Sequence, residues 1–123
     1  MLFRSVGDNA ALGTGALTFT GGRLSSNSAS ARTLANTLSL TGALTLGDAT
    51  NSGALTLSGN AALTGNTTLT VASAATLSGI LSGTYNLTTA GASELTLSGA
   101  NSFSGTTTVN AGILTLEIGR AHV

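Results

Sequence analysis

The sequence predicts an all-β protein, a parallel β-helix (β-solenoid) of about five short coils, and a recurring triplet is the first reason. Leu-x-Leu or Leu-x-Phe occurs at residues 17–19, 38–40, 55–57, 95–97 and 114–116, with a looser copy at 77–81 and steps of 17 to 22 residues. Apolar and polar residues alternate around each triplet, and Gly, Asn and Ser interrupt the alternation, as in short strands joined by tight turns. Such strands are stable only when each coil stacks on its copies.

Internal alignment is the second reason. Residues 95–116 begin and end with Leu-Thr-Leu, so they form one full period. Residues 54–71 align with residues 94–110: in both segments a second glycine follows the first by six residues, and a Thr-rich strand comes next. These glycines are Gly59 and Gly65 in one segment and Gly99 and Gly105 in the other. Composition alone would not hold two glycines and a threonine run in register.

The composition is the third reason. The chain has 123 residues, the size of one domain, with 7% charged and 3% aromatic residues. A core of stacked Leu, Ala, Val and Ile suits these numbers better than a compact centre built on aromatics. The zero net charge gives no electrostatic case for nucleic acid or an anionic membrane as a partner. The absence of cysteine is compatible with secretion, and the absence of proline suits continuous strand ladders.

No segment is predicted to span a membrane. The apolar stretches are far shorter than the roughly 20 residues of a membrane helix, and the strands are shorter than the roughly 9–11 residues of a membrane barrel strand. The first six residues lack the apolar region and the cleavage pattern of a signal peptide, so Met1 is interpreted as an internal or accidental start and the chain as a fragment.

The elements follow in order. Short strands are expected at residues 17–19, from Leu24, at 44–46, within the most regular stretch 54–71, at 80–81, at 85–87 and within 94–116. Residues 31–40 could be scored as helix because Leu34 and Leu38 are four apart, but their Thr and Ser content favours strand. Polar loops are expected at 25–30 and 47–53. Both ends are expected to lack a cap and to fray or to associate edge to edge.

Residues that could carry chemistry are few, and the prediction is that there is no catalytic, cofactor-binding or metal site. Apart from His122, the chain has no histidine, cysteine or lysine. Stacked coils could bring Asp48 and Glu94 to similar edges, as in carbohydrate-cleaving β-helices, and Asp8 is the remaining carboxylate before the C-terminal tail. The favoured interpretation is structural: Asp48 belongs to a Gly-Asp turn, and Glu94 is an exposed residue before a strand.

Three further motifs have structural readings. The pieces Gly13-Thr14-Gly15 and Ser98-Gly99 resemble phosphate loops but lack a following lysine and helix, so they are predicted to be turns. The runs 67–68 and 106–108 could form threonine ladders like those of ice-binding solenoids, but the pattern is not repeated in every coil. Four asparagines are predicted at corners, where they could stack into a ladder: Asn60, Asn66, Asn101 and Asn110.

Residues 94–116 closely resemble the autotransporter-associated β-strand repeat, also called the passenger-associated transport repeat. The motif is kept at residues 95–101, at Gly105, Thr107 and Leu114, and at residues 109–112. Phe103 replaces the usual tyrosine, and Thr106 replaces a second glycine. The upstream region looks like the spacer that commonly precedes this motif.

The resemblance implies a right-handed parallel β-helix in the passenger of a Gram-negative autotransporter or a related giant adhesin, secreted or held at the cell surface. It also implies a downstream outer-membrane β-barrel in the full-length chain as partner, and no catalysis or cofactor. The expected function is a structural stalk that assists export. The alternative is an adhesin-type module that contacts glycans or other cells through Thr, Ser and Asn ladders; an enzymatic β-helix is improbable.

Two divisions of the chain follow. Residues 1–116 are predicted to be solenoid passenger repeats, with 94–116 the best-matching repeat. Residues 117–123, Glu-Ile-Gly-Arg-Ala-His-Val, break the pattern at once. They resemble the translation of a widely used sequencing adapter and are therefore predicted to be a non-native tail, left out of all reasoning about the fold.

Overall fold

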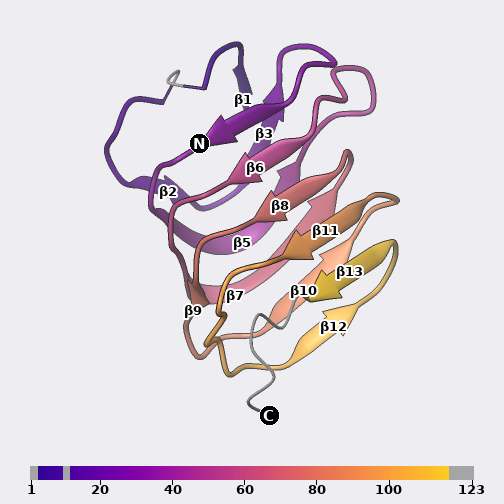
Figure 1. The fold of residues 1–123 in the computed structure, drawn as a ribbon. Helices are drawn as coiled ribbons and strands as arrows, with labels where there is room; N and C mark the ends of the chain where they lie inside the picture. Colours follow the sequence, from indigo (N-terminus) through magenta and orange to yellow (C-terminus); the bar gives the residue numbers. More distant parts are fainter. Residues whose placement is uncertain (1–2, 10–11, 117–123) are drawn as a thin grey trace.

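The computed structural model describes residues 3–9 and 12–116, which wind into a parallel β-solenoid of about six turns, with no helix in these two ranges (Figure 1). The all-β, β-helical prediction is thus confirmed, with about one turn more than predicted. The strands are β1 (Phe3–Val6), β2 (Leu17–Phe19), β3 (Gly22–Ser26), β4 (Arg32–Leu34), β5 (Leu38–Leu46), β6 (Leu55–Leu57), β7 (Ala61–Val71), β8 (Ala75–Leu77), β9 (Leu81–Ser82), β10 (Leu87–Ala90), β11 (Glu94–Leu97), β12 (Thr107–Val109) and β13 (Ile113–Leu116).

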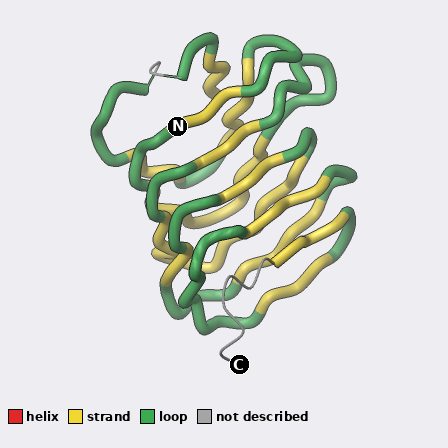
Figure 2. The backbone as a smooth tube through the Cα atoms, viewed as in Figure 1, coloured by secondary structure: helices red, strands yellow, loops and turns green. Residues whose placement is uncertain are grey.

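Two parallel sheets form the walls of the solenoid. The five-stranded sheet has the order β13-β11-β8-β6-β4. The eight-stranded sheet has the order β1-β3-β5-β7-β10-β12, with β2 on the first half of β5 and β9 on the first half of β7. The register shifts between Leu40 and Gly42, where the left-handed φ of Gly42, 86°, allows the strand to bend. The eight-stranded sheet therefore supplies two walls and the five-stranded sheet the third (Figure 2).

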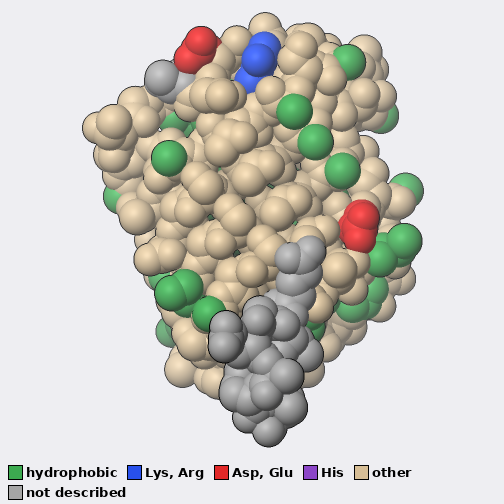
Figure 3. All heavy atoms as spheres, in the orientation of Figure 1, with side chains coloured by type: hydrophobic (Ala, Val, Ile, Leu, Met, Phe, Trp, Pro, Cys, Tyr) green, Lys and Arg blue, Asp and Glu red, His purple; other side chains and the backbone are tan. Residues whose placement is uncertain are grey.

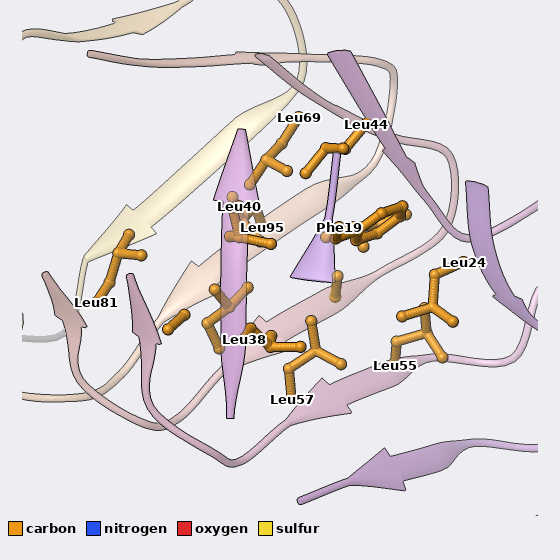
Figure 4. Close-up of a cluster of buried hydrophobic side chains, with 14 of the residues drawn as sticks. Phe19, Leu24, Leu38, Leu40, Leu44, Leu55, Leu57, Leu69, Leu81 and Leu95 are labelled. Carbon is orange, nitrogen blue, oxygen red and sulfur yellow. The ribbon is translucent and has the colours of Figure 1, made fainter. Parts of the chain in front are cut away.

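The core is a stack of aliphatic side chains, with Phe19 among them, inside these walls (Figure 4). In β6, β8 and β11 the outer residues of the triplet are buried and the central threonine faces outward, as the alternation predicts. Leu57 pairs with Leu77, and Leu77 with Leu97, so that each coil places a leucine over the previous one. Each fully buried leucine contributes roughly 1.5–3 kcal/mol.

The spacing of the triplets predicts that they all occupy one position of the coil, but in the structure they do not. Residues 17–19 pair with 38–40 in the eight-stranded sheet, whereas 55–57, 95–97 and 114–116 lie in the five-stranded sheet. The copy between 55–57 and 95–97 is Ala75–Leu77, not the looser run 77–81. The prediction is wrong here because every wall of a solenoid alternates in the same way, so a Leu-x-Leu triplet does not tell which wall it forms.

A column of glycines lets the coils approach closely at one corner. A Cβ atom at Gly79 would collide with the carbonyl oxygen of Gly59 in the preceding coil, and a Cβ at Gly99 with the carbonyl oxygen of Gly79. Only glycine fits such a column. Gly59 and Gly99 stand two coils apart in this column, which accounts for the register of the internal alignment.

The N-terminal end of the solenoid is capped, contrary to the prediction that both ends are open. The buried side chain of Asn36 donates through Nδ2 to the carbonyl oxygens of Leu12, Gly13 and Gly15, at 3.4, 3.3 and 2.7 Å. Asn9 Oδ1 accepts the backbone N–H of Thr33, the central residue of β4, at 2.9 Å. Asn9 and residues 12–15 are thereby bonded to β4 and to Asn36, which follows it.

Candidate functional site

Asp48 is part of a corner and not of an acid–base pair. Its Oδ1 accepts the backbone N–H groups of Thr50 and Asn51, at 2.7 and 3.1 Å, and its Oδ2 pairs with Arg23 Nη1 at 2.7 Å. These contacts lower the pKa of Asp48. The hydrogen bond from the N–H of Asn51 has the largest effect, followed by the bond from the N–H of Thr50 and then by the charge of Arg23. The carboxylate is thus kept ionised as a turn former, which agrees with the structural reading of the Gly-Asp pair.

Glu94 does not join Asp48. It is exposed at the start of β11, as predicted, and its Oε2 accepts a hydrogen bond from Thr115 Oγ1 of the next coil. Asp48 lies in the corner after β5, and Glu94 lies in the corner after β10. Since β7 lies between β5 and β10 in the sheet, the two corners are two strand spacings apart, about 10 Å. Asp8 is exposed in the segment after β1. Across 3–9 and 12–116, no three His, Cys, Asp or Glu residues cluster to hold a metal ion.

The two phosphate-loop resemblances are turns. The carbonyl oxygens of Gly13 and Gly15 point at the side chain of Asn36, so this segment presents acceptors to its neighbour where an anion needs donors. The backbone N–H of Ser98 donates to the carbonyl oxygen of Leu77 at 3.0 Å, and Gly99 belongs to the glycine column.

The asparagines of the corners connect neighbouring coils. Asn60 Oδ1 accepts the N–H of Ile80, and Asn101 Oδ1 accepts the N–H of Leu81, both at 2.9 Å. A second column runs from Asn66 through Asn86: Asn66 Oδ1 accepts the N–H of Asn86, at 3.0 Å, and Asn86 Oδ1 accepts the N–H of Thr106, at 2.9 Å. The ladder thus consists of hydrogen bonds from backbone N–H groups to asparagine side chains, and not of bonds between asparagine side chains. Asn86 was not singled out from the sequence, although it lies 20 residues after Asn66.

Threonines form two columns: the longer one lies outside the predicted runs 67–68 and 106–108, and the shorter one includes Thr68 and Thr108 from these runs. Five of them stand in register on the outer face of the five-stranded sheet, one per coil: Thr33, Thr56, Thr76, Thr96 and Thr115. Three of them, Thr56, Thr96 and Thr115, are central residues of Leu-Thr-Leu triplets, which is the signal that the sequence offers. On the eight-stranded sheet, Thr68, Thr88 and Thr108 form a shorter column. Thr67, by contrast, is buried, and its Oγ1 donates to the carbonyl oxygens of Leu40 and Gly65.

The face in view in Figure 3 carries few charged side chains. Most of it is backbone and uncharged polar side chains, with isolated acidic and basic side chains and scattered hydrophobic ones. Among the described residues, no helix is both long and apolar enough to cross a membrane. His122 and the predicted tail 117–123 lie outside the described residues.

Comparison with known proteins identifies one family. No curated protein and no solved structure matches the chain. The family model of the passenger-associated-transport-repeat matches residues 87–116, which run from the start of β10 to the end of β13. This span includes the whole motif at 94–116, so the resemblance found in the sequence is confirmed: the last complete coil of the solenoid carries a passenger-associated transport repeat.

Proposed function

We propose that this chain is a structural segment of a secreted autotransporter passenger, a stalk whose coil-by-coil stacking assists export. The observation that carries the proposal is the unbroken register of the coils around the repeat matched at residues 87–116. Stacking releases free energy each time a coil adds to the previous one, and each coil contacts only its neighbours. A chain that folds in this way outside a membrane resists sliding back through its transporter.

The location and partner follow from the same family. We place the segment outside a Gram-negative cell, secreted or at its surface, with the outer-membrane β-barrel of its own full-length chain as its export partner. Residues 1–116 form the solenoid unit in this proposal, and residues 117–123 are not part of the natural protein. We assign it no catalytic residue and no cofactor, since Asp48 serves as a turn contact and Glu94 as a coil-to-coil contact.

A fusion tests the stalk. The segment is placed between a reporter and the barrel of an autotransporter, and protease accessibility of the reporter on intact cells is measured. We expect the segment to raise surface display relative to an unstructured linker of equal length. Leu77→Asp, which puts a charge into the core, removes the gain, whereas Thr76→Asp on the outer face retains it. Equal display with the linker and both variants would contradict the proposal.

The second candidate function is an adhesin face, and the five-threonine column favours it. Hydroxyl and methyl groups repeat there at the spacing of adjacent strands, about 4.8 Å, on a nearly neutral surface. Retention on a glycan array tests this candidate. Replacing Thr56, Thr76 and Thr96 with lysine should abolish retention, while the same change at Thr68, Thr88 and Thr108 should not. Absence of retention for the unmodified chain rules the candidate out.

A further inference from the structure

Three stacked corners of the solenoid surround the one tyrosine of the chain. Residues 84–86 form the corner between β9 and β10, and residues 64–66 and 104–106 occupy the same place one coil before and one coil after. The asparagine contacts described above fix this stacking, because they join each of these corners to the next. We call these nine residues the Tyr85 platform.

Tyr85 is partly exposed and has glycine on both sides. It is 44% exposed, and its hydroxyl group has no hydrogen-bond partner among the residues that the structure describes. Gly65 and Gly105 stand at its position in the neighbouring coils, and a Cβ at Gly105 would collide with the carbonyl oxygen of Tyr85. The neighbouring coils thus come close without a side chain of their own at this position. Since the following coil is present, the exposure of Tyr85 does not depend on where the chain ends.

The residues around Tyr85 are polar and uncharged. Asn66 and Asn86 each accept a backbone N–H through Oδ1, and their Nδ2 groups have no hydrogen-bond partner in the described part of the chain. Hydroxyl groups stand at the four remaining positions, all of them exposed: Thr64, Thr84, Ser104 and Thr106. The platform therefore combines an aromatic ring, free amide donors and hydroxyl groups, and it contains no charged residue.

We propose that the Tyr85 platform binds a neutral glycan. One face of a hexose ring consists of C–H groups that pack on an aromatic ring, whereas its rim of hydroxyl groups needs donors and acceptors. Tyrosine provides such a contact at little entropic cost, because only two side-chain torsions are fixed. An acidic sugar would find no cation here to pair with its carboxylate. The platform is separate from the five-threonine column, which lies on the other sheet, and the proposal does not depend on the export role.

The fluorescence of Tyr85 tests the proposal, because the chain has no tryptophan and no other tyrosine. The full chain is titrated with three neutral probes, cellohexaose, maltohexaose and chitohexaose, and with one acidic probe, hexagalacturonate. We expect at least one neutral probe to change the tyrosine emission in a saturable way and the acidic probe to leave it unchanged. No saturable change with any neutral probe, or an equal response to the acidic probe, would overturn the proposal.

Calorimetry with the responding probe assigns the binding to Tyr85. Tyr85→Ala should weaken binding about tenfold or more, since the aromatic face is lost. Ile80→Ala is the matched control and should bind like the unmodified chain, because Ile80 is 42% exposed at the preceding corner of the same coil. Equal losses for the two variants would indicate unspecific apolar contact and contradict the proposal.

Two further changes test the amide donors and the place of the site. Asn66→Asp keeps an oxygen that accepts the N–H of Asn86 but removes the Nδ2 donor, so it should weaken binding severalfold. Asn60→Asp, at the other asparagine corner, should not weaken it. The triple lysine variant of the five-threonine column should bind like the unmodified chain. Loss of binding in that variant alone would place the glycan on the column and overturn the assignment to Tyr85, without bearing on the export role.

Discussion

The two ends of the solenoid have the same alternation of apolar and polar residues, but the apolar side chains are buried at one end and exposed at the other. At the N-terminal end, Leu34 is 1% exposed although its strand, β4, is outermost in the five-stranded sheet. At the C-terminal end, Leu116 occupies the same place in the outermost strand β13 and is 53% exposed. The difference is the cover over β4, where Asn9 bonds to Thr33 and residues 12–15 bond to the side chain of Asn36. A cap thus turns an edge coil into a core coil without a change in the repeat itself.

The largest effect expected from this comparison is on truncated leucines. Leu34→Ala should lower the free energy of unfolding by about 2–5 kcal/mol, because it opens a cavity in a closed core. The same change at Leu116, which is already half in solvent, should cost less than about 1 kcal/mol. Chemical denaturation of the two variants measures the difference. Equal losses would mean that the ends do not differ energetically.

The cap is tested next through Asn36. Asn36→Ala leaves three carbonyl oxygens without their donor and should lower the free energy of unfolding by about 1–3 kcal/mol. Residues 12–16 should also become open to limited proteolysis while β7 and β10 stay protected. Asn110→Ala, at an exposed corner of the open end, is the control and should leave the cleavage pattern unchanged. Unaltered proteolysis of Asn36→Ala would remove this residue from the explanation of the cap.

Acid should act on the N-terminal half through Asp48. Its pKa is lowered from the ordinary value of 3.8, so the folded state binds this proton less readily than the unfolded state. The stability that results is present above pH 3.8 and is lost as the pH falls through the lowered pKa. Asp48→Asn should therefore show a smaller loss of stability between pH 6 and pH 3 than the unmodified chain. Parallel denaturation profiles of the two proteins against pH would contradict this.

The smallest expected effect is that of alanine substitutions at two glycines of the cap, Gly13 and Gly15. A Cβ at Gly15 meets nothing within 4 Å, and its backbone has no left-handed φ. Gly15→Ala should stabilise the fold by about 0.4–1 kcal/mol by restricting the unfolded chain. Gly13 has a φ of 70°, so Gly13→Ala should destabilise instead. Thermal unfolding of both variants checks the opposite signs, and a common sign would mean that the segment is not held in this conformation.

Much of the fold follows from local alternation, and the rest depends on contacts between coils. Leu-Thr-Leu predicts which side chains face inward, because strand geometry alone decides this. Whether residues 38–40 and 55–57 share a wall depends on the corner between them, which the triplets do not encode. The cap was missed because Asn36 and Asn9 act on partners more than 20 residues away, and nothing in the neighbouring residues marks such a contact.

The candidate site shows the same division. Asp48 could be interpreted correctly because a Gly-Asp turn is local and its hydrogen bonds reach only Thr50 and Asn51. The corner positions of Asn60, Asn66 and Asn101 were predictable for the same reason. Their hydrogen bonds to the next or previous coil were not, since these require the pitch of each turn. The five-threonine column likewise emerges only when the register of neighbouring coils is known.

The direction of the bonds between coils has a mechanical consequence. Backbone ladders and asparagine contacts both run from coil to coil, along the axis of the stack. A force that pulls the two ends apart therefore loads a few bonds at a time and peels one coil from the next. Each event frees about 20 residues, the register of adjacent coils, and lengthens the chain by roughly 70 Å. A passenger with such a segment would extend stepwise under tension and rewind when released, as a spring between the cell and whatever holds its far end.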